Sequence, residues 1–167
     1  GGGGGYGAAT DALDFRIRDV AEGGVLNLTK LPGLAEAGQL PPAVLQRVFA
    51  SHTLEVLAVM DLTGCAIEAV PVEFKNISTL RELILKANKL AQGLQTGRCS
   101  PDFLSPSLKV LDVSSNGLGA DHCEVLLRHA QHLQCLRLGR NALTSSPRVL
   151  EQLRGLRELD LSFNQIC

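Results

Sequence analysis

The densest group of side chains that could bind a metal ion lies between residues 122 and 135. It consists of His122, Cys123, His129, His132 and Cys135. Imidazole and thiolate groups are ligands that zinc prefers, and His129 and His132 are spaced to share one face of a helix. Cys123, however, falls on the apolar face of the same helical pattern, and Cys135 begins the next extended segment. We therefore predict no metal site.

Nucleophilic catalysis is the second chemistry to consider, because the chain contains five cysteines. A catalytic thiol needs a basic or helix-terminal neighbour that lowers its pKa, and no local pattern of this kind accompanies any of them. The sequence also lacks the G-x-x-x-x-G-K motif that binds nucleotide phosphates. We predict that the chain is not an enzyme, has no catalytic or cofactor-binding residues and acts on no small-molecule substrate.

Composition argues against several further classes of partner. Lysine and arginine number 16 against 17 aspartates and glutamates, so no net field attracts nucleic acid or anionic membranes. No segment approaches the ~20 apolar residues of a membrane helix, and no signal-peptide pattern is present. The odd number of dispersed cysteines argues against disulfides and for a reducing, cytoplasmic compartment. The glycosylation sequons at Asn27 and Asn76 leave an extracellular setting as the alternative.

One pattern of apolar residues repeats along the chain and accounts for most of its leucines. The copies begin at residues 57, 80, 108, 133 and 156, so successive periods are 23, 28, 25 and 23 residues. A complete copy, from Leu80 to Leu90, reads L-x-x-L-x-L-x-x-N-x-L. Cys65 takes the asparagine position in the first copy, and a degenerate sixth copy lies near Leu26.

This pattern resembles that of the leucine-rich-repeat superfamily, intracellular type, over about residues 23–167. The resemblance implies an α/β solenoid, curved and right-handed, with a parallel sheet on its concave face and helices and extended turns on its convex face. It also implies a buried ladder of Asn88, Asn116, Asn141 and Asn164, whose amides can donate to and accept from the turning backbone. The motif is specific for fold and says little about function.

The segments between the repeats differ in their expected structure. Apolar residues at helical spacing predict helices after Pro42, over residues 121–130 and after Pro147. In the second of these, Asp121 with Glu124 three residues later forms a helix-capping signal.

The longest connection, residues 91–107, is expected to loop out, because Gly93 and Gly97 with two prolines interrupt any helix. Phe103 and Leu104 would anchor this loop on the core; the alternative is a loop that protrudes toward a partner. The segment from Ile67 to Phe74 has the pattern of a more extended return.

The sequence divides into three expected regions. Residues 1–10 are predicted to be a flexible glycine-rich linker. Residues 11–56 should form an N-terminal cap and the degenerate first repeat, because a solenoid needs its end covered. Residues 57–167 should hold the leucine-rich repeats, without a visible C-terminal cap.

The outward residues of consecutive parallel strands should line up as columns on the concave face. One column should contain Asp61, Ile84, Asp112, Arg137 and Asp160, and its neighbour Val59, Glu82, Val110, Cys135 and Glu158. Opposite charges can neutralise one another across these strands, but apolar residues standing side by side in solvent and framed by charges are typical of an interface centre. The predicted partner-binding residues are Val59, Ile84, Lys86, Val110, Asp112, Arg137, Arg140, Asp160 and Phe163.

We therefore expect a protein–protein interaction module, an adaptor or scaffold segment, that binds a protein on its concave face. The convex face, the 91–107 loop and the C-terminal edge are alternative surfaces. A structural domain packed within a larger polypeptide is an alternative function.

An RNA- or translation-associated factor is a further alternative. Gln39-Leu40-Pro41-Pro42, which follows the Leu26-Asn27-Leu28-Thr29 segment, resembles leucine-rich-repeat proteins that carry a tRNA-synthetase-like B3/B4 domain. The balanced charge argues against direct contact with RNA.

Overall fold

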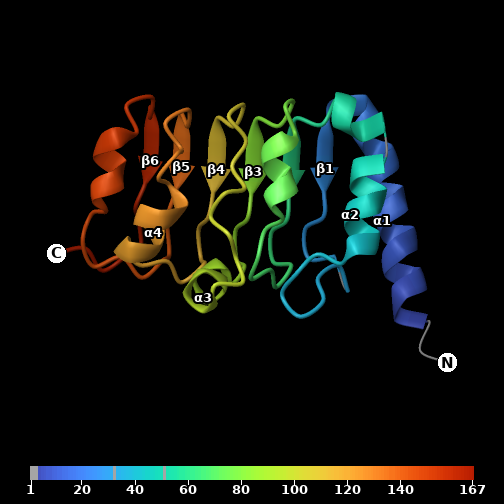
Figure 1. The fold of residues 1–167 in the computed structure, drawn as a ribbon, viewed down its shortest axis with the longest axis horizontal. Helices are drawn as coiled ribbons and strands as arrows, with labels where there is room; N and C mark the ends of the chain where they lie inside the picture. The colour runs from blue at the N-terminus through green and yellow to red at the C-terminus, as the bar shows by residue number, and fades with distance from the viewer. Residues whose placement is uncertain (1–3, 32, 51) are drawn as a thin grey trace.

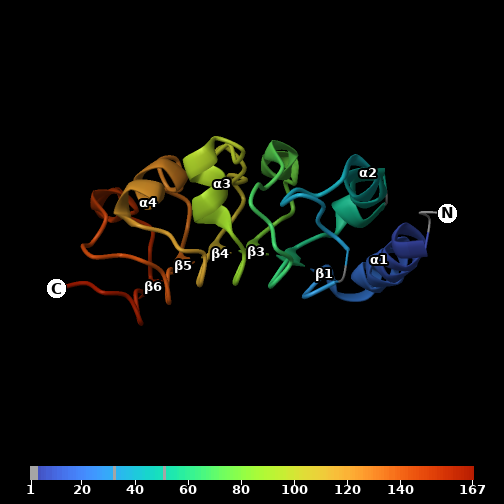
Figure 2. The ribbon, with the colours of Figure 1, turned by 90° about the horizontal axis from the view of Figure 1, so that it is seen from below.

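The computed structural model describes residues 4–31, 33–50 and 52–167. Within these ranges, six short strands form one open parallel sheet in the order of the sequence. They are β1 (Val25–Asn27), β2 (Val59–Asp61), β3 (Glu82–Ile84), β4 (Val110–Asp112), β5 (Cys135–Arg137) and β6 (Glu158–Asp160). Figure 1 shows these strands side by side, and Figure 2 shows them along the inner side of an arc. The predicted α/β solenoid with a parallel sheet on its concave face is confirmed.

The connections between strands run over the outer side of the arc (Figure 2). The α-helices are α1 (Gly4–Gly23), α2 (Pro42–Ala50), α3 (Leu90–Thr96) and α4 (Ala120–Leu126). Three connections contain 3₁₀-helices, η1 (His52–Glu55), η2 (Val72–Asn76) and η3 (Arg148–Gln152). The helix predicted after Pro42 is therefore confirmed, whereas the one after Pro147 is only a single 3₁₀ segment.

The core lies between the sheet and these outer connections. The middle residue of every strand points into it, and the aligned row is Leu26, Met60, Leu83, Leu111, Leu136 and Leu159. The first five of these side chains are at most 1% exposed, because a neighbouring repeat covers each side of them. Leu159, on the last strand, is 43% exposed. On the outer side, Phe74 and Phe103 fill the space between connections and are each 1% exposed.

The predicted asparagine ladder joins each repeat to the one before it. The Asn141 Oδ1 accepts from the backbone amides of Asn116 and Leu118 in the preceding repeat, at 2.9 and 3.0 Å. Its Nδ2 donates to the carbonyl of Val113 in that repeat, at 3.1 Å, and to that of Leu138 in its own, at 2.9 Å. Related bonds are made by Asn88, Asn116 and Asn164.

At the variant position of the ladder, the Cys65 thiol donates to the Leu28 carbonyl at 3.1 Å. Among the described residues that are not exposed, no buried side-chain nitrogen or oxygen lacks a hydrogen-bond partner. The ladder is therefore complete wherever it is covered by protein.

The N-terminal region differs from one expectation. Helix α1 begins at Gly4, so residues 4–10 are helical and do not form the linker predicted for residues 1–10; residues 1–3 lie outside the described ranges. The helix is fixed by its later turns, where Leu13 and Val20 are at most 1% exposed in the core, and it continues from there toward the N-terminus. Phe15, on the opposite side of α1, is 64% exposed.

Residues 91–107 also differ from the expected loop, because their first part belongs to helix α3. Gly93 is buried within α3, where its missing side chain allows the helix to touch the backbone of Glu68. Gly97 ends the helix in the left-handed conformation, with φ of 78°, as C-terminal glycines commonly do. The prediction that glycine interrupts the helix is therefore wrong for Gly93, whereas Gly97 does end it. The predicted anchoring of the remaining loop by Phe103 is confirmed by its burial.

The cap of helix α4 is also not the predicted one. The helix begins at Ala120 after Gly119, whose amide donates to the Nδ1 of His122 at 3.0 Å. Glu124 instead accepts from the amide of Val149, at 3.0 Å, and so ties α4 to the next repeat. The competing inter-repeat bond explains why the local capping signal fails.

The ladder predicts a large effect of truncating a covered asparagine. Asn116→Ala leaves the amide of Leu90 without an acceptor and removes one of the two side-chain donors to each of the carbonyls of Leu85 and Val113, in a site that is 3% exposed. We expect a loss of about 3 kcal/mol in the free energy of unfolding, measured in urea. The matched variant Asn164→Ala, at the partly exposed end of the ladder, should cost only about 1 kcal/mol because water can replace it. Equal losses at the two positions would contradict this account.

Gly93 within α3 and Gly97 at its end predict losses of stability of different size and cause when each is replaced by alanine. A Cβ on Gly93 would overlap the carbonyl oxygen of Glu68 and lie 3.2 Å from the Cβ of Cys99. Gly93→Ala should therefore destabilise the chain by about 2 kcal/mol or more in thermal unfolding, although alanine stabilises exposed helix sites by about 1 kcal/mol. Gly97→Ala meets no atom within 4 Å and should cost only about 1 kcal/mol of left-handed strain. A stabilising Gly93→Ala would show that α3 does not pack this closely.

Candidate functional site

The concave face is built from columns of residues that alternate with the buried row. The first column contains Val25, Val59, Glu82, Val110, Cys135 and Glu158, and the second contains Asn27, Asp61, Ile84, Asp112, Arg137 and Asp160. Backbone bonds beyond the strands extend the alignment to a third column, Thr29, Thr63, Lys86, Ser114, Gly139 and Ser162, and to a fourth, Lys30, Gly64, Ala87, Ser115, Arg140 and Phe163. The predicted alignment of these residues is therefore observed, with β1 added as a sixth row.

The apolar residues of these columns are less exposed than predicted. Val59, Ile84 and Val110 are half-buried rather than standing in solvent, because the residues of adjacent columns and rows cover their flanks. Glu82 separates Val59 from Val110 in the first column, and Ile84 lies in the second column, diagonal to both. The three residues thus form a staggered apolar group around Glu82, not a continuous row.

Most residues of the second column are used by the chain itself. Asn27, Asp61, Asp112 and Asp160 each accept, through Oδ1, from the backbone amide two residues later, that of Thr29, Thr63, Ser114 and Ser162 respectively, at 2.9–3.0 Å. Such bonds close the turn that follows each strand. Two residues predicted to bind a partner, Asp112 and Asp160, therefore have a structural role, and Asp112 is only 8% exposed.

Two rows of the second column break this pattern. Ile84 and Arg137 carry no acceptor for the amide two residues later, and neither Lys86 nor Gly139 has a hydrogen bond from its amide in the part of the chain that the structure describes. Ile84 lies between Asp61 and Asp112, and Arg137 lies next to Asp112 on the other side. The two exceptions are thus the alternate rows of β3 and β5.

The fourth column places large side chains in a conformation that favours glycine. All its members have positive φ, from 52° at Lys30 to 67° at Gly64, because the chain bends there into the asparagine ladder. Phe163 has φ of 56° and is 71% exposed, and the Arg140 guanidinium stacks on its ring at 4.2 Å from the centroid. Left-handed backbone costs a non-glycine residue about 1 kcal/mol, so neither side chain is explained by local stability.

The charges around Arg137 are arranged without a close ion pair. In the described ranges, the salt bridges are Arg47–Asp14, Lys75–Asp102 and Arg98–Glu68, all away from this face. Hydrogen bonds from Ser162, and then the positive charge of Arg137, hold the pKa of Asp160 below its usual range. Asp160 is therefore ionised at neutral pH, and the Arg137 guanidinium keeps free donors.

The residues considered for metal binding or catalysis lie in separate environments. His122 caps α4, Cys123 is fully buried beneath the helix, and Cys135 faces the sheet side beside Glu158. Burial raises the pKa of the Cys123 thiol to about 12, and burial also raises the pKa values of Cys65, Cys99 and Cys135. These thiols are protonated at neutral pH. The described residues contain no group of three or more ligating side chains that could hold a metal ion.

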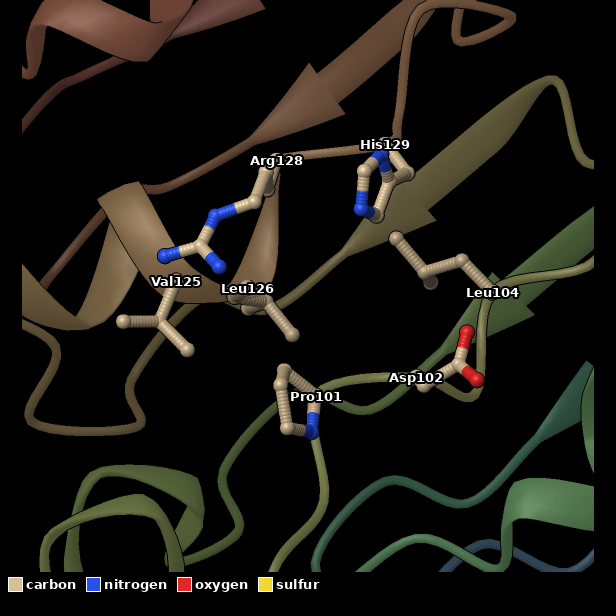
Figure 3. Close-up of a pocket in the computed structure, with 7 residues that line it drawn as sticks. All are labelled: Pro101, Asp102, Leu104, Val125, Leu126, Arg128 and His129. Atoms are coloured by element: carbon tan, nitrogen blue, oxygen red, sulfur yellow. The ribbon is translucent and has the colours of Figure 1, made fainter.

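A groove lies on the outer side, between residues 101–104 and α4. Its volume is about 240 Å³, and its lining is Pro101, Asp102, Leu104, Val125, Leu126, Arg128 and His129. Figure 3 shows Arg128 and His129 on the α4 side and Asp102 across from them. Asp102 is paired with Lys75 at 2.7 Å, and Leu126 is buried in the core. The sequence does not indicate this groove, because its two walls come from different repeats.

One signal for the turn-closing carboxylates was present in the sequence. Asp61, Asp112 and Asp160 are each followed, two residues later, by Thr or Ser, and Asn27 by Thr29. Ile84 and Arg137 are followed instead by Lys86 and Gly139. Comparing the repeats at the second and third columns separates the Asn and Asp residues that close a turn from Ile84 and Arg137, which do not.

The chain is similar to known leucine-rich-repeat proteins. The family model for leucine-rich repeats matches residues 106–166, and none of the curated proteins matches the chain. Internalin C2 from Listeria monocytogenes has 19% sequence identity and a TM-score of 0.52, over 83% of this chain and 59% of its own. The plant peptide hormone receptor RGFR1, in complex with RGF2, has 22% identity and a TM-score of 0.43, over 74% of this chain and 18% of its own.

The chain thus spans less than two thirds of either solved structure. Among the described residues, no helix has the length and apolar character needed to cross a membrane. The repeats before residue 106 share one sheet, one register and one asparagine ladder with those that the family model matches. Residues 106–166 therefore match the leucine-rich-repeat family, and the repeats before them continue the same solenoid fold.

Proposed function

We propose that the chain is an adaptor or scaffold segment that binds a protein on its concave face, with Ile84 and Arg137 at the centre of the contact. The observation that carries this proposal is the break in the second column. Four of its six rows bear an Asn or Asp that closes the following turn, and these two do not.

The energetics of that break support a binding role. A side-chain oxygen that accepts an otherwise free amide stabilises a protein by about 1 kcal/mol. Asp or Asn at positions 84 and 137 would supply this bond with the geometry already seen at Asp112 and Asp160. The chain instead has an aliphatic and a cationic side chain there, of the kinds that anchor interfaces.

The dimensions of the face suit a single segment of a partner. Six strands at about 4.8 Å spacing give a sheet about 24 Å across, which one helix or one extended peptide can cover. The staggered group of Val59, Ile84 and Val110 would supply its apolar centre, and Lys86, Arg137 and Arg140 would supply its charged margin. Leucine-rich-repeat proteins generally bind other proteins, which agrees with this arrangement.

The buried thiols favour a binding role over catalysis. Because they are free, they also favour a reducing, cytoplasmic setting. Cys65, Cys99, Cys123 and Cys135 are free and buried, and burial raises the pKa of each. A protonated, enclosed thiol is a poor nucleophile.

Affinity capture from cell lysate tests the proposal. Ile84→Arg places a charge in the apolar centre, and Arg137→Glu inverts the central charge. Each change should reduce capture of the partner at least tenfold, and the melting temperature should stay within about 5 °C of that of the unmodified chain.

Matched changes on the outer side provide the control. Val125→Arg, at an exposed valine of the groove between residues 101–104 and α4, and Arg148→Glu, on η3, should leave capture unchanged. Capture that survives both concave changes, or that is lost with Val125→Arg instead, would overturn the concave-face assignment.

A further inference from the structure

The two free strand-end amides have different surroundings. Lys86 is exposed, so water can reach its backbone, and its row presents the apolar Ile84. Gly139 is buried, and a buried amide without an acceptor destabilises the folded chain. That amide has no acceptor within the described residues, and its row also presents Arg137 and Arg140.

Gly139 lies between two arginines of its own row and polar side chains of the next row. Arg137 precedes it by two residues, and Arg140 follows it with its guanidinium plane held against Phe163. Stacking fixes the plane of a guanidinium and leaves the N–H groups at its edge free to donate. On the next row, Asp160 and Ser162 lie close enough that a Cβ on Gly139 would be 3.3 Å from the Asp160 Oδ2 and from the Ser162 Oγ.

The neighbouring carboxylates that the structure describes are bonded within their own turns or columns and form no close ion pair with the two arginines. The Asp160 Oδ1 accepts from the amide of Ser162 at 2.9 Å, and Asp112 accepts from that of Ser114 at 2.9 Å, so each is held in its own turn. Glu158 is 3.6 Å from the thiol of Cys135 in the first column. Arg140 has no acidic partner within salt-bridge distance in the described ranges.

We propose that a carboxylate of the partner binds at Arg137, Gly139 and Arg140, and takes the position that an Asp or Asn side chain takes in the other rows. It accepts from the Gly139 amide and pairs with the two guanidinium groups. The carboxylate is that of an aspartate or glutamate side chain, because the sheet is open on both sides of this row and a chain can continue past it. The inference rests on the proposed function, since it names the group by which the partner is recognised.

Nuclear magnetic resonance of the labelled chain tests this site with small probes. Titration with N-acetylglutamate α-amide, at ionic strength held constant with sodium chloride, should move the Gly139 amide proton downfield in a saturable manner. The Ser114 amide, whose acceptor is Asp112, should not move. N-acetylleucine amide, which lacks a carboxylate, should move neither.

Two variants separate this site from general attraction of anions. Arg140→Gln should weaken the probe about tenfold, because it removes one charge-assisted hydrogen bond. Arg137→Asn should shift the Gly139 amide downfield without any probe, because the new side chain can accept from it as Asn27 accepts from Thr29, and should abolish the response to the probe. Arg148→Gln, on the outer side, should change neither property.

The inference is overturned if the Gly139 amide does not respond to the glutamate probe, or if Arg148→Gln weakens the probe as much as Arg140→Gln does. N-acetylleucine offers a terminal carboxylate. If it binds and the glutamate probe does not, the assignment of the carboxylate to a side chain is wrong. If the Gly139 amide does not respond to the probe but Ile84→Arg loses partner capture, the carboxylate site is wrong and the proposed concave-face function is retained. If Ile84→Arg and Arg137→Glu capture the partner normally and the Gly139 amide still responds to the probe, the concave-face function is wrong and only an anion site remains.

Discussion

The structure depends on one hydrogen-bonding constraint, which is that the backbone must turn out of every strand while it is buried between two repeats. Each turn leaves amides and carbonyls that water cannot reach, and the asparagine of the next repeat satisfies them. Asn141 bonds two amides and a carbonyl of the preceding repeat and a carbonyl of its own. Because one side chain serves two repeats, it sets their register as well as their stability.

This constraint determines what the concave face can present. The ladder holds the preceding residue of each row in the left-handed conformation, so that Arg140 and Phe163 project from a bend that would suit glycine. Two residues after each strand, another backbone amide lacks a backbone acceptor. In four rows the Asn or Asp at the end of the strand accepts from it. Acidic residues that look available for a partner are thereby committed to the fold. The two rows that lack this bond are those of Ile84 and Arg137, and the proposed function assigns recognition of the partner to them.

The sequence contains enough to predict the solenoid, because leucine spacing and the ladder asparagines report burial and turn chemistry that are local to each repeat. It also predicts the column alignment, since Arg137 lies beside Asp112 and Asp160 as expected. It does not predict contacts between repeats. Gly93 reads as a helix breaker until Glu68 is seen against it, and Glu124 reads as a capping residue until the amide of Val149 is seen to occupy it. The exposure of Ile84 likewise depends on neighbours in other rows.

The central claim is that the strand-end amides divide into those bonded within the chain and those left open for a partner. Amide hydrogen exchange of the unbound chain tests it most directly, and Ser114 and Gly139 form a matched pair, because both residues are buried and only Ser114 has an acceptor. The account predicts slow exchange at Thr63 and Ser114 and exchange faster by about tenfold or more at Lys86 and Gly139. Equal protection at all four amides would mean that the chain satisfies every row itself, and would contradict the account.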